Sequence, residues 1–153
     1  MRKKNKLKSQ IQNMKKKNHL ISHTNYEIID IKNNILDHRV ARDFNTINDL
    51  IKSCDIGLSS VIVKKELLVK ECLFANLKTK EDFVLWLNIL KKNVKISALQ
   101  KNLMYWRKLD NSLSSSIIQK IRDGYCVYNK FMKFNVLKSL LFLFLLSFNS
   151  LLK

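Results

Sequence analysis

The spacing of apolar residues predicts several helices along the chain. Residues 2–17 are basic but carry a narrow apolar stripe, Leu7, Ile11 and Met14, which we expect to dock on the rest of the domain. Residues 80–92 are apolar on nearly all sides, as in a helix that is buried over most of its surface. The segment "NSLSSSIIQKIRDGYCVYNKFM" predicts an amphipathic helix that follows a serine-rich cap.

Short strands are predicted between these helices. Residues 26–31 are β-prone, Asn33-Asn34 is turn-like, and "ILDHRV" can form the returning strand. Another β-branched run covers residues 59–63, and "VKISAL" and "NLMYWRK" predict two further strands. In the last of these, Met104 and Trp106 share a face of the strand. Together these elements predict a single α/β unit.

The C-terminal residues are the most apolar part of the chain. No polar residue interrupts Leu140 to Leu146, yet this run is shorter than the ~20 residues that span a bilayer. We therefore expect a main unit over residues 1–133 and an apolar C-terminal helix over residues 134–153. Such a helix suits a membrane interface or the surface of a partner, and the lysines just before the run, Lys130, Lys133 and Lys138, suit anionic headgroups.

The charge balance indicates an anionic neighbour. The 153 residues include 29 Lys+Arg against 12 Asp+Glu, a formal net charge of +17, and 46% hydrophobic residues exclude a disordered tail. Nucleic acid, an anionic membrane face and a phosphorylated ligand all satisfy such a charge. Three widely spaced cysteines without a C-x-x-C motif indicate reduced thiols and a cytosolic setting.

Glu81 and Asp82 are the only adjacent acidic residues, and they stand at the start of the apolar helix. Thr79, three residues before Asp82, fits a capping box, and the helix dipole favours carboxylates in a first turn. The same carboxylates could instead accept a proton from a substrate. The spacing alone favours the cap, although the two roles are compatible.

Four segments in order resemble a known family more specifically than any single motif does. They are "KLKSQIQNMKKKNHLISHTNYEIID", "LIKSCDIGLSSVIVKKELL", "KTKEDFVLWLNILKK" and "LMYWRKLDNSLSSSIIQKIRDGYCVYNKF". This series resembles the later part of family 2 glycosyltransferases of the GT-A fold, in the bacterial branch that builds cell-envelope polysaccharides. The resemblance covers residues 5–153.

The resemblance implies a nucleotide-diphosphosugar half that is followed by an acceptor-binding half. It places this chain in the acceptor-side, C-terminal portion of the GT-A fold. In such enzymes a D-x-D motif holds a divalent metal, Mg or Mn, on the sugar-nucleotide diphosphate. No two aspartates of this chain have that spacing. We therefore expect no metal site in this chain, and we expect the nucleotide half to be missing or supplied by a separate upstream chain.

The resemblance also implies roles for the acidic pair and its helix. Asp82 would be the general base that takes the proton of the acceptor hydroxyl, with Glu81 beside it. Trp86 lies one turn after Asp82 and could stack on a sugar ring, with a core position as the alternative.

Three more residues are candidate substrate ligands. Arg107 could bind the leaving diphosphate, or else form a surface ion pair. Ser59 and Ser60, in "GLSSV", could donate hydroxyls to the acceptor, or else belong to a plain edge strand.

The expected function is the transfer of a sugar from a nucleotide-diphosphosugar to a cell-envelope glycan or a lipid-linked acceptor. We expect a cytoplasmic protein, peripheral on the inner membrane face, and a truncated or split form that is inactive alone because the D-x-D motif is absent. The alternative is a small basic protein without enzymatic activity that binds an anionic membrane or nucleic acid. Nucleic acid is disfavoured, since the aromatic residues lie among apolar residues and not within the basic run.

Overall fold

The computed structural model describes residues 1–109 and 116–152, which form a four-stranded open sheet with helices on both sides. The strands are β1 (Ile21–Ile29), β2 (Ile35–Arg39), β3 (Ile62–Val63) and β4 (Ser97–Arg107). The helices are α1 (Lys6–Lys16), α2 (Ile47–Leu50), α3 (Glu81–Lys91), α4 (Ile117–Cys126) and α5 (Val136–Leu151). A π-helical stretch, Val127–Phe131, continues α4. The predicted α/β class with a helical C-terminal segment is confirmed.

Strand β1 is the centre of the sheet. Ser22 pairs with both Ile62 of β3 and Ser97 of β4, so these two strands lie on opposite sides of β1. Strand β2 shares the side of β3 and pairs antiparallel with the far end of β1. Strand β4 runs parallel to β1, which requires the long crossover that contains α2 and α3.

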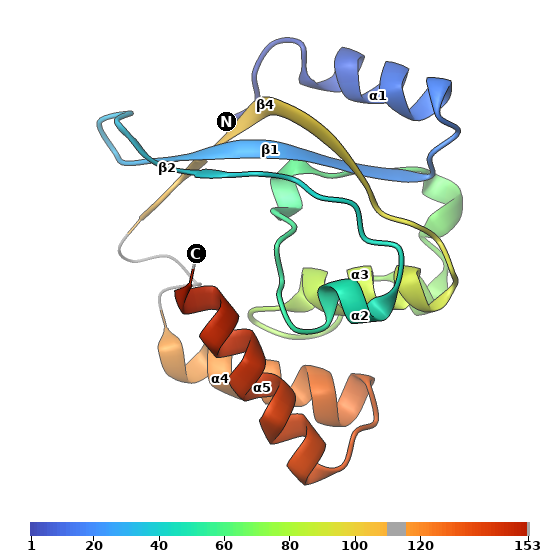
Figure 1. Cartoon of the computed structure of the whole chain (residues 1–153), viewed down its shortest axis with the longest axis vertical. Helices are drawn as coiled ribbons and strands as arrows, with labels where there is room; N and C mark the ends of the chain where they lie inside the picture. Colours follow the sequence, from blue (N-terminus) through green and yellow to red (C-terminus); the bar gives the residue numbers. More distant parts are fainter. Residues whose placement is uncertain (110–115, 153) are drawn as a thin grey trace.

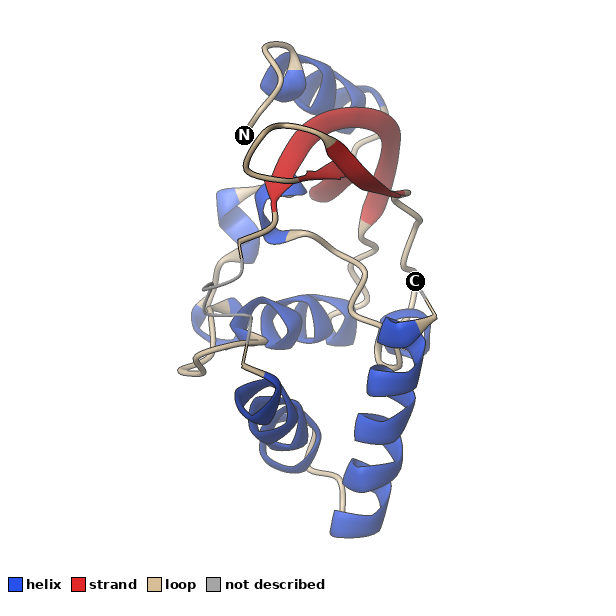
Figure 2. Cartoon of the chain, turned by 90° about the vertical axis from the view of Figure 1, so that its left-hand side faces the viewer, coloured by secondary structure: helices blue, strands red, loops and turns tan. Residues whose placement is uncertain are grey.

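The elements are arranged in layers. Helix α1 covers one side of the sheet, α2 and α3 lie on the other side, and α4 and α5 form the far end of the molecule (Figures 1 and 2). Seven residues of α3 are buried, as its nearly continuous apolar pattern predicts. The Tyr128 hydroxyl, just after α4, donates to the Ile51 carbonyl at 2.7 Å, which ties the helical end to the crossover.

The hairpin and the short capped helix follow the sequence closely. The Asp30 carboxylate accepts the backbone N–H groups of Lys32 and Asn34, and Asn33 adopts a left-handed φ of 71° in the turn. Thr46 and Asp49 form a complete capping box at the start of α2.

Three local expectations are wrong. Residues 94–99 and 102–108 were expected as two strands, but residues 97–107 form the single strand β4, whose pairing with β1 is irregular near Asn25. The strand expected over 59–63 is only Ile62–Val63, because a 3-10 turn occupies Leu58–Ser60.

The third wrong expectation is that the stripe of Leu7, Ile11 and Met14 docks on the domain. The buried face of α1 consists instead of Lys6, Gln10 and Met14, and Leu7 and Ile11 are exposed. Gln10 sets this orientation, since its side-chain amide donates to the buried carbonyls of Ser22 and Ser60.

Candidate functional site

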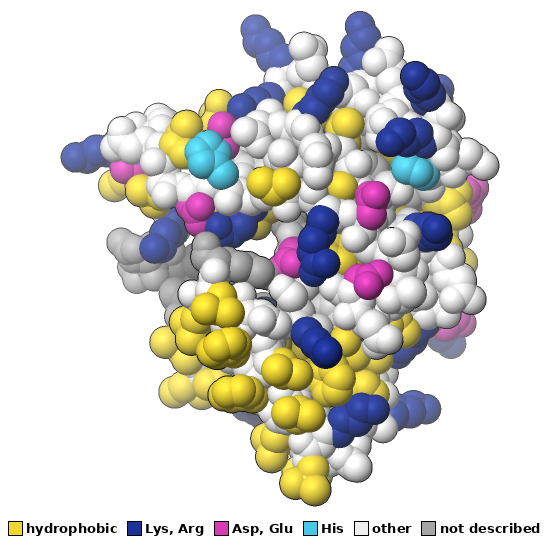
Figure 3. Space-filling model, in the orientation of Figure 1, with side chains coloured by type: hydrophobic (Ala, Val, Ile, Leu, Met, Phe, Trp, Pro, Cys, Tyr) yellow, Lys and Arg dark blue, Asp and Glu magenta, His cyan; other side chains and the backbone are white. Residues whose placement is uncertain are grey.

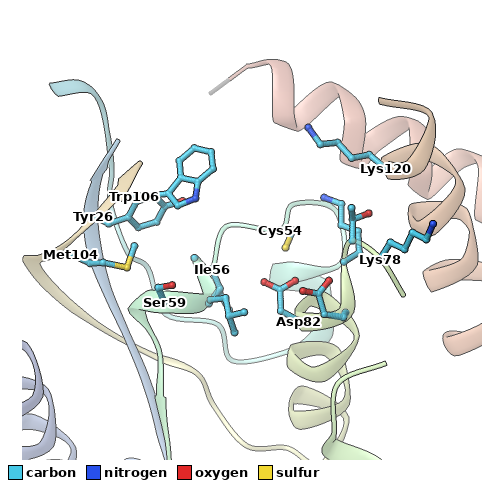
Figure 4. Close-up of a pocket in the computed structure, with 14 residues that line it drawn as sticks. Tyr26, Cys54, Ile56, Ser59, Lys78, Asp82, Met104, Trp106 and Lys120 are labelled. Carbon is cyan, nitrogen blue, oxygen red and sulfur yellow. The ribbon is translucent and has the colours of Figure 1, made fainter. Parts of the chain in front are cut away.

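A cavity of about 510 Å³ opens between the sheet and the helical end. Four parts of the chain contribute to it: the two central strands, the segment after α2, the first turn of α3 with the loop before it, and α4. Figure 4 shows Tyr26 and Trp106 on one side and Lys78 and Lys120 on the other, with Asp82 between them.

The acidic pair lies in this cavity. Glu81 and Asp82 form the first turn of α3, and both line the cavity wall. Burial raises the pKa of the Asp82 carboxyl, and the negative charge of Glu81 raises it further. The N–H group of Phe83 donates to Asp82 Oδ1 at 2.8 Å. A partly buried carboxylate with a raised pKa in a cavity is a candidate proton acceptor.

The opposite wall is aromatic. Tyr26 of β1 and Trp106 of β4 line it together with Met104, and 42% of Trp106 is exposed. Gly57 allows the Tyr26 ring to approach the neighbouring segment, because a Cβ at Gly57 would lie 2.9 Å from Tyr26 Cε1. An exposed aromatic ring such as that of Trp106 can stack on the apolar face of a sugar.

Basic residues stand at the remaining side. Lys78 and Lys80 come from the loop before α3 and Lys120 comes from α4. Lys80 has a left-handed φ of 66°, which turns the loop sharply into the helix. The cavity therefore combines an aromatic wall, a carboxylate pair and cationic groups that can bind an anionic ligand.

Curated proteins with similar sequences are named as glycosyltransferases. No protein-family model matches the chain. This chain is 36% identical over 132 residues to the Escherichia coli UDP-Glc:alpha-D-GlcNAc-diphosphoundecaprenol beta-1,3-glucosyltransferase WfgD. The alignment covers 84% of this chain and 50% of WfgD. The chain is homologous to bacterial glycosyltransferases.

Two other relatives agree with this assignment. TuaG of Bacillus subtilis (strain 168), named as a teichuronic acid biosynthesis glycosyltransferase, is 26% identical over 138 residues, which cover 90% of this chain and 54% of TuaG. A glycosyltransferase of Rickettsia bellii (strain RML369-C) is 29% identical over 92 residues, which cover 59% of this chain and 13% of that protein. The chain thus spans about half the length of WfgD and TuaG.

The fold of this glycosyltransferase homologue agrees with the relationship. A mixed α/β unit with an open sheet and a helical C-terminal segment is consistent with a partial GT-A-like domain. The resemblance that the sequence indicated is therefore confirmed at the level of glycosyltransferases.

The loop that presents Asp82 is held by a residue that the sequence did not single out. Asp123 of α4 is buried and accepts both the backbone N–H group and the hydroxyl of Thr79, at 2.8 and 2.9 Å. Gln119 donates to its other oxygen. Thr79 therefore does not cap α3, contrary to the capping-box expectation. It fixes the loop to α4 instead, and the N-cap is Lys80.

Burial alone would raise the pKa of Asp123, but the hydrogen bonds from Gln119 and Thr79 more than offset this and hold the pKa below its ordinary value. Asp123 is thus an ionised anchor, whereas the nearby Asp82 is a carboxylate with a raised pKa.

Two of the predicted substrate ligands lie outside the cavity. Trp86 is 1% exposed and belongs to the core, which is the alternative that its apolar helix suggested. Ser60 is fully buried and donates to the Gly57 carbonyl, while its neighbour Ser59 does line the cavity.

Arg107 is also placed elsewhere. Its guanidinium donates to the carbonyls of Asp30 and Ile31 and to Asn33 Oδ1, and so it fastens the β1–β2 turn. Among the described residues, Arg107 is not one of those that line the cavity around Asp82. Side chains on adjacent positions of a strand face opposite ways, so that Trp106 enters the cavity and Arg107 does not. The shared face of Met104 and Trp106 was the signal that could have identified the aromatic wall.

A metal site is not built from the residues that the structure describes. Within residues 1–109 and 116–152, no group of three or more His, Cys, Asp or Glu side chains is placed to hold an ion. Glu81 and Asp82 are the carboxylates of the described residues that line the cavity. A divalent metal on a diphosphate, as the family resemblance implies, takes one or two carboxylates together with phosphate oxygens and water. No third His, Cys, Asp or Glu among the described residues is grouped with this pair.

Proposed function

We propose that this chain forms the acceptor side of a glycosyltransferase. The enzyme would move a sugar from a nucleotide-diphosphosugar to a cell-envelope glycan or a lipid-linked acceptor. The observation that carries the proposal is Asp82, a carboxylate with a raised pKa that faces an aromatic cavity in a chain homologous to glycosyltransferases.

The geometry supports the following chemistry. An acceptor sugar stacks on Trp106 and Tyr26 and directs one hydroxyl to Asp82. As the hydroxyl oxygen attacks the anomeric carbon of the donor, Asp82 takes its proton, and the bond between that carbon and the diphosphate oxygen breaks. The nucleotide diphosphate leaves with the bonding electrons. Because the pKa of Asp82 is raised, its carboxylate is a stronger base than an exposed aspartate.

The donor side requires residues beyond this acceptor half. This chain contains no D-x-D motif and spans about half of its curated relatives. We infer that another segment, in the same polypeptide or in a separate upstream chain, binds the nucleotide and its divalent metal. The 153-residue chain alone is then expected to show no sugar transfer, and measurable transfer that is lost in Asp82→Asn would contradict this.

The name of WfgD specifies a UDP-glucose donor and a GlcNAc-diphosphoundecaprenol acceptor. A lipid-linked acceptor of this kind places the reaction at a membrane surface. We therefore propose a cytoplasmic protein that is peripheral on the inner membrane face.

Calorimetric titration with acceptor analogues tests the proposal without a donor. The probes are sugar diphosphates with short, water-soluble alkyl chains, beginning with α-D-GlcNAc. We expect Trp106→Ala to weaken binding roughly two- to twelvefold, as the loss of one stacking ring of about 0.5–1.5 kcal/mol implies. The matched control Phe74→Ala removes an exposed ring outside the cavity and should leave binding unchanged. The proposal fails if no probe binds, or if both variants bind as the wild type does.

A further inference from the structure

Helix α5 turns an apolar stripe away from the protein. Its outward residues recur at the helical period and are all exposed: Leu137, Leu140, Leu141, Phe144, Phe148 and Leu151. The inward face packs on α4, where Gly124 permits close approach, since a Cβ there would lie 2.8 Å from Leu143 Cδ1. The orientation of α5 is thus fixed by packing, with its aliphatic and aromatic side chains left outside.

Helix α4 extends the same kind of surface. Ile117, Ile118 and Ile121 are exposed, Ile118 by 81%. Figure 3 shows hydrophobic side chains gathered over the end of the molecule that α4 and α5 form. We call these three isoleucines and the six outward residues of α5 the α4–α5 apolar face. Patches of this extent mark a binding surface.

The charges around this face indicate what binds it. Residues 116–152 carry five cationic side chains: Lys120, Arg122, Lys130, Lys133 and Lys138. The one acidic residue in this range, Asp123, is buried and accepts hydrogen bonds from Thr79 and Gln119. A second copy of the chain would bring these cations against their equivalents, because the same patch meets itself in a symmetric dimer. An anionic surface complements them.

We propose that the α4–α5 apolar face docks on an anionic phospholipid membrane. No helix among the described residues is long and apolar enough to cross a bilayer. The 16 residues of α5 extend about 24 Å, short of the roughly 30 Å hydrocarbon core, so the helix lies in the plane of the interface. Its phenylalanines and leucines enter the acyl boundary, and the lysines contact phosphate groups.

This docking deepens the proposed function, and its meaning for catalysis rests on that proposal. Lys120 belongs to α4 and also lines the cavity that contains Asp82. With α4 on the membrane, the lysine side of the cavity is turned to the headgroup layer. A lipid-linked acceptor could then reach Asp82 while its lipid chain stays in the bilayer.

Vesicle cosedimentation tests the docking surface. Vesicles of phosphatidylglycerol and phosphatidylcholine, without any acceptor, are compared with pure phosphatidylcholine. We expect the chain to bind the anionic vesicles, and the double variant Phe144→Glu, Phe148→Glu to bind at least ~tenfold more weakly, because two large apolar groups are lost from the interface. Phe74→Glu, one Phe-to-Glu change at an exposed ring outside the face, should bind as the wild type does. High salt should weaken binding.

Three results would overturn the docking proposal. The first is equal binding of the chain to neutral and anionic vesicles, and the second is binding of the double variant as strong as that of the wild type. The third is no vesicle binding, together with a wild-type dimer in analytical ultracentrifugation that is absent in the double variant. Circular dichroism of each variant shows that it remains folded. Since the vesicles contain no acceptor and the calorimetric titration contains no membrane, failure of one proposal is distinguishable from failure of the other.

Discussion

Asp82 and Asp123 illustrate how the surroundings of two carboxylates assign them opposite properties. Asp82 is desolvated beside Glu81, and the backbone hydrogen bonds of its own turn do not offset this, so its charged form is disfavoured. Asp123 is buried too, but three donors from Thr79 and Gln119 favour its charged form. One carboxylate is suited to take up a proton, and the other holds the loop that carries it.

The raised pKa of Asp82 predicts a gain in stability on its removal. Ionised Asp82 is less favourable in the folded than in the unfolded chain, so stability is lost as pH rises through the raised pKa. Asp82→Asn should therefore increase the free energy of unfolding at pH 7, by roughly 0.5–2 kcal/mol. Urea unfolding measures this. The gain should shrink at about pH 3, below the ordinary aspartate pKa. An exposed control, Glu66→Gln, should change little, and a loss of stability in Asp82→Asn at pH 7 would contradict the prediction.

The lowered pKa of Asp123 predicts that removal of this carboxylate reduces the stability of the protein. Its lowered pKa contributes stability above the ordinary carboxyl pKa that is lost as pH falls through the lowered value. Asp123→Ala should cost about 1–3 kcal/mol at pH 7, because the buried donors of Thr79 are left unpaired. The cost should diminish in acid, and Thr79→Val, which removes one of these donors, should be milder. An equal cost at all pH values in urea unfolding would show that Asp123 contributes by packing alone.

At the scale of elements, the contact between α4 and α5 depends on Gly124. Gly124→Val would force Leu143 away from α4, because even a Cβ at this position lies 2.8 Å from Leu143 Cδ1. We expect a loss of about 1–3 kcal/mol in thermal or chemical unfolding. Ile118→Val, on the exposed face of the same helix, is the control and should change stability little. Unaltered stability of Gly124→Val would mean that α5 does not pack on α4 as described.

The helices and strands also show how far the spacing of apolar residues predicts the fold. The apolar pattern of 80–92 and the turn at Asn33 required no knowledge of distant residues, and both α3 and the hairpin formed as predicted. Helix α1 did not follow its apolar stripe, since Gln10 satisfies two buried carbonyls from β1 and the segment before β3. That choice depends on tertiary contacts that no local pattern contains.

The site was predictable to a similar extent. The acidic pair was identified from its position and from the family resemblance, and Ser59 also lines the cavity. Trp106 and Asp123 were not identified as site residues from the sequence. Their roles depend on how β4, which carries Trp106, and α4, which carries Asp123, lie around the start of α3. Arg107 was predicted from its motif to bind the leaving diphosphate or to form a surface ion pair, whereas its guanidinium donates to the hairpin turn.

For the whole molecule, the arrangement unites three surfaces around one loop. The aromatic wall belongs to the sheet, Asp82 to the crossover helix, and Lys120 to the helical end that carries the α4–α5 apolar face. Asp123 connects the last two. The molecule thus combines an aromatic wall, a carboxylate with a raised pKa and a basic side, which in the proposed acceptor half would stack a sugar, take up a proton and face the membrane.

The central claim is that an acceptor hydroxyl meets Asp82 in this cavity. Nuclear magnetic resonance of the chain, with aspartate labelled by ¹³C at the side-chain carboxyl, tests it during titration with the α-D-GlcNAc diphosphate probe. We predict that the Asp82 carboxyl titrates above the ordinary aspartate pKa and that its resonance and the Trp106 indole signal shift together on binding. Saturable binding of the probe that leaves both signals unmoved would contradict the account.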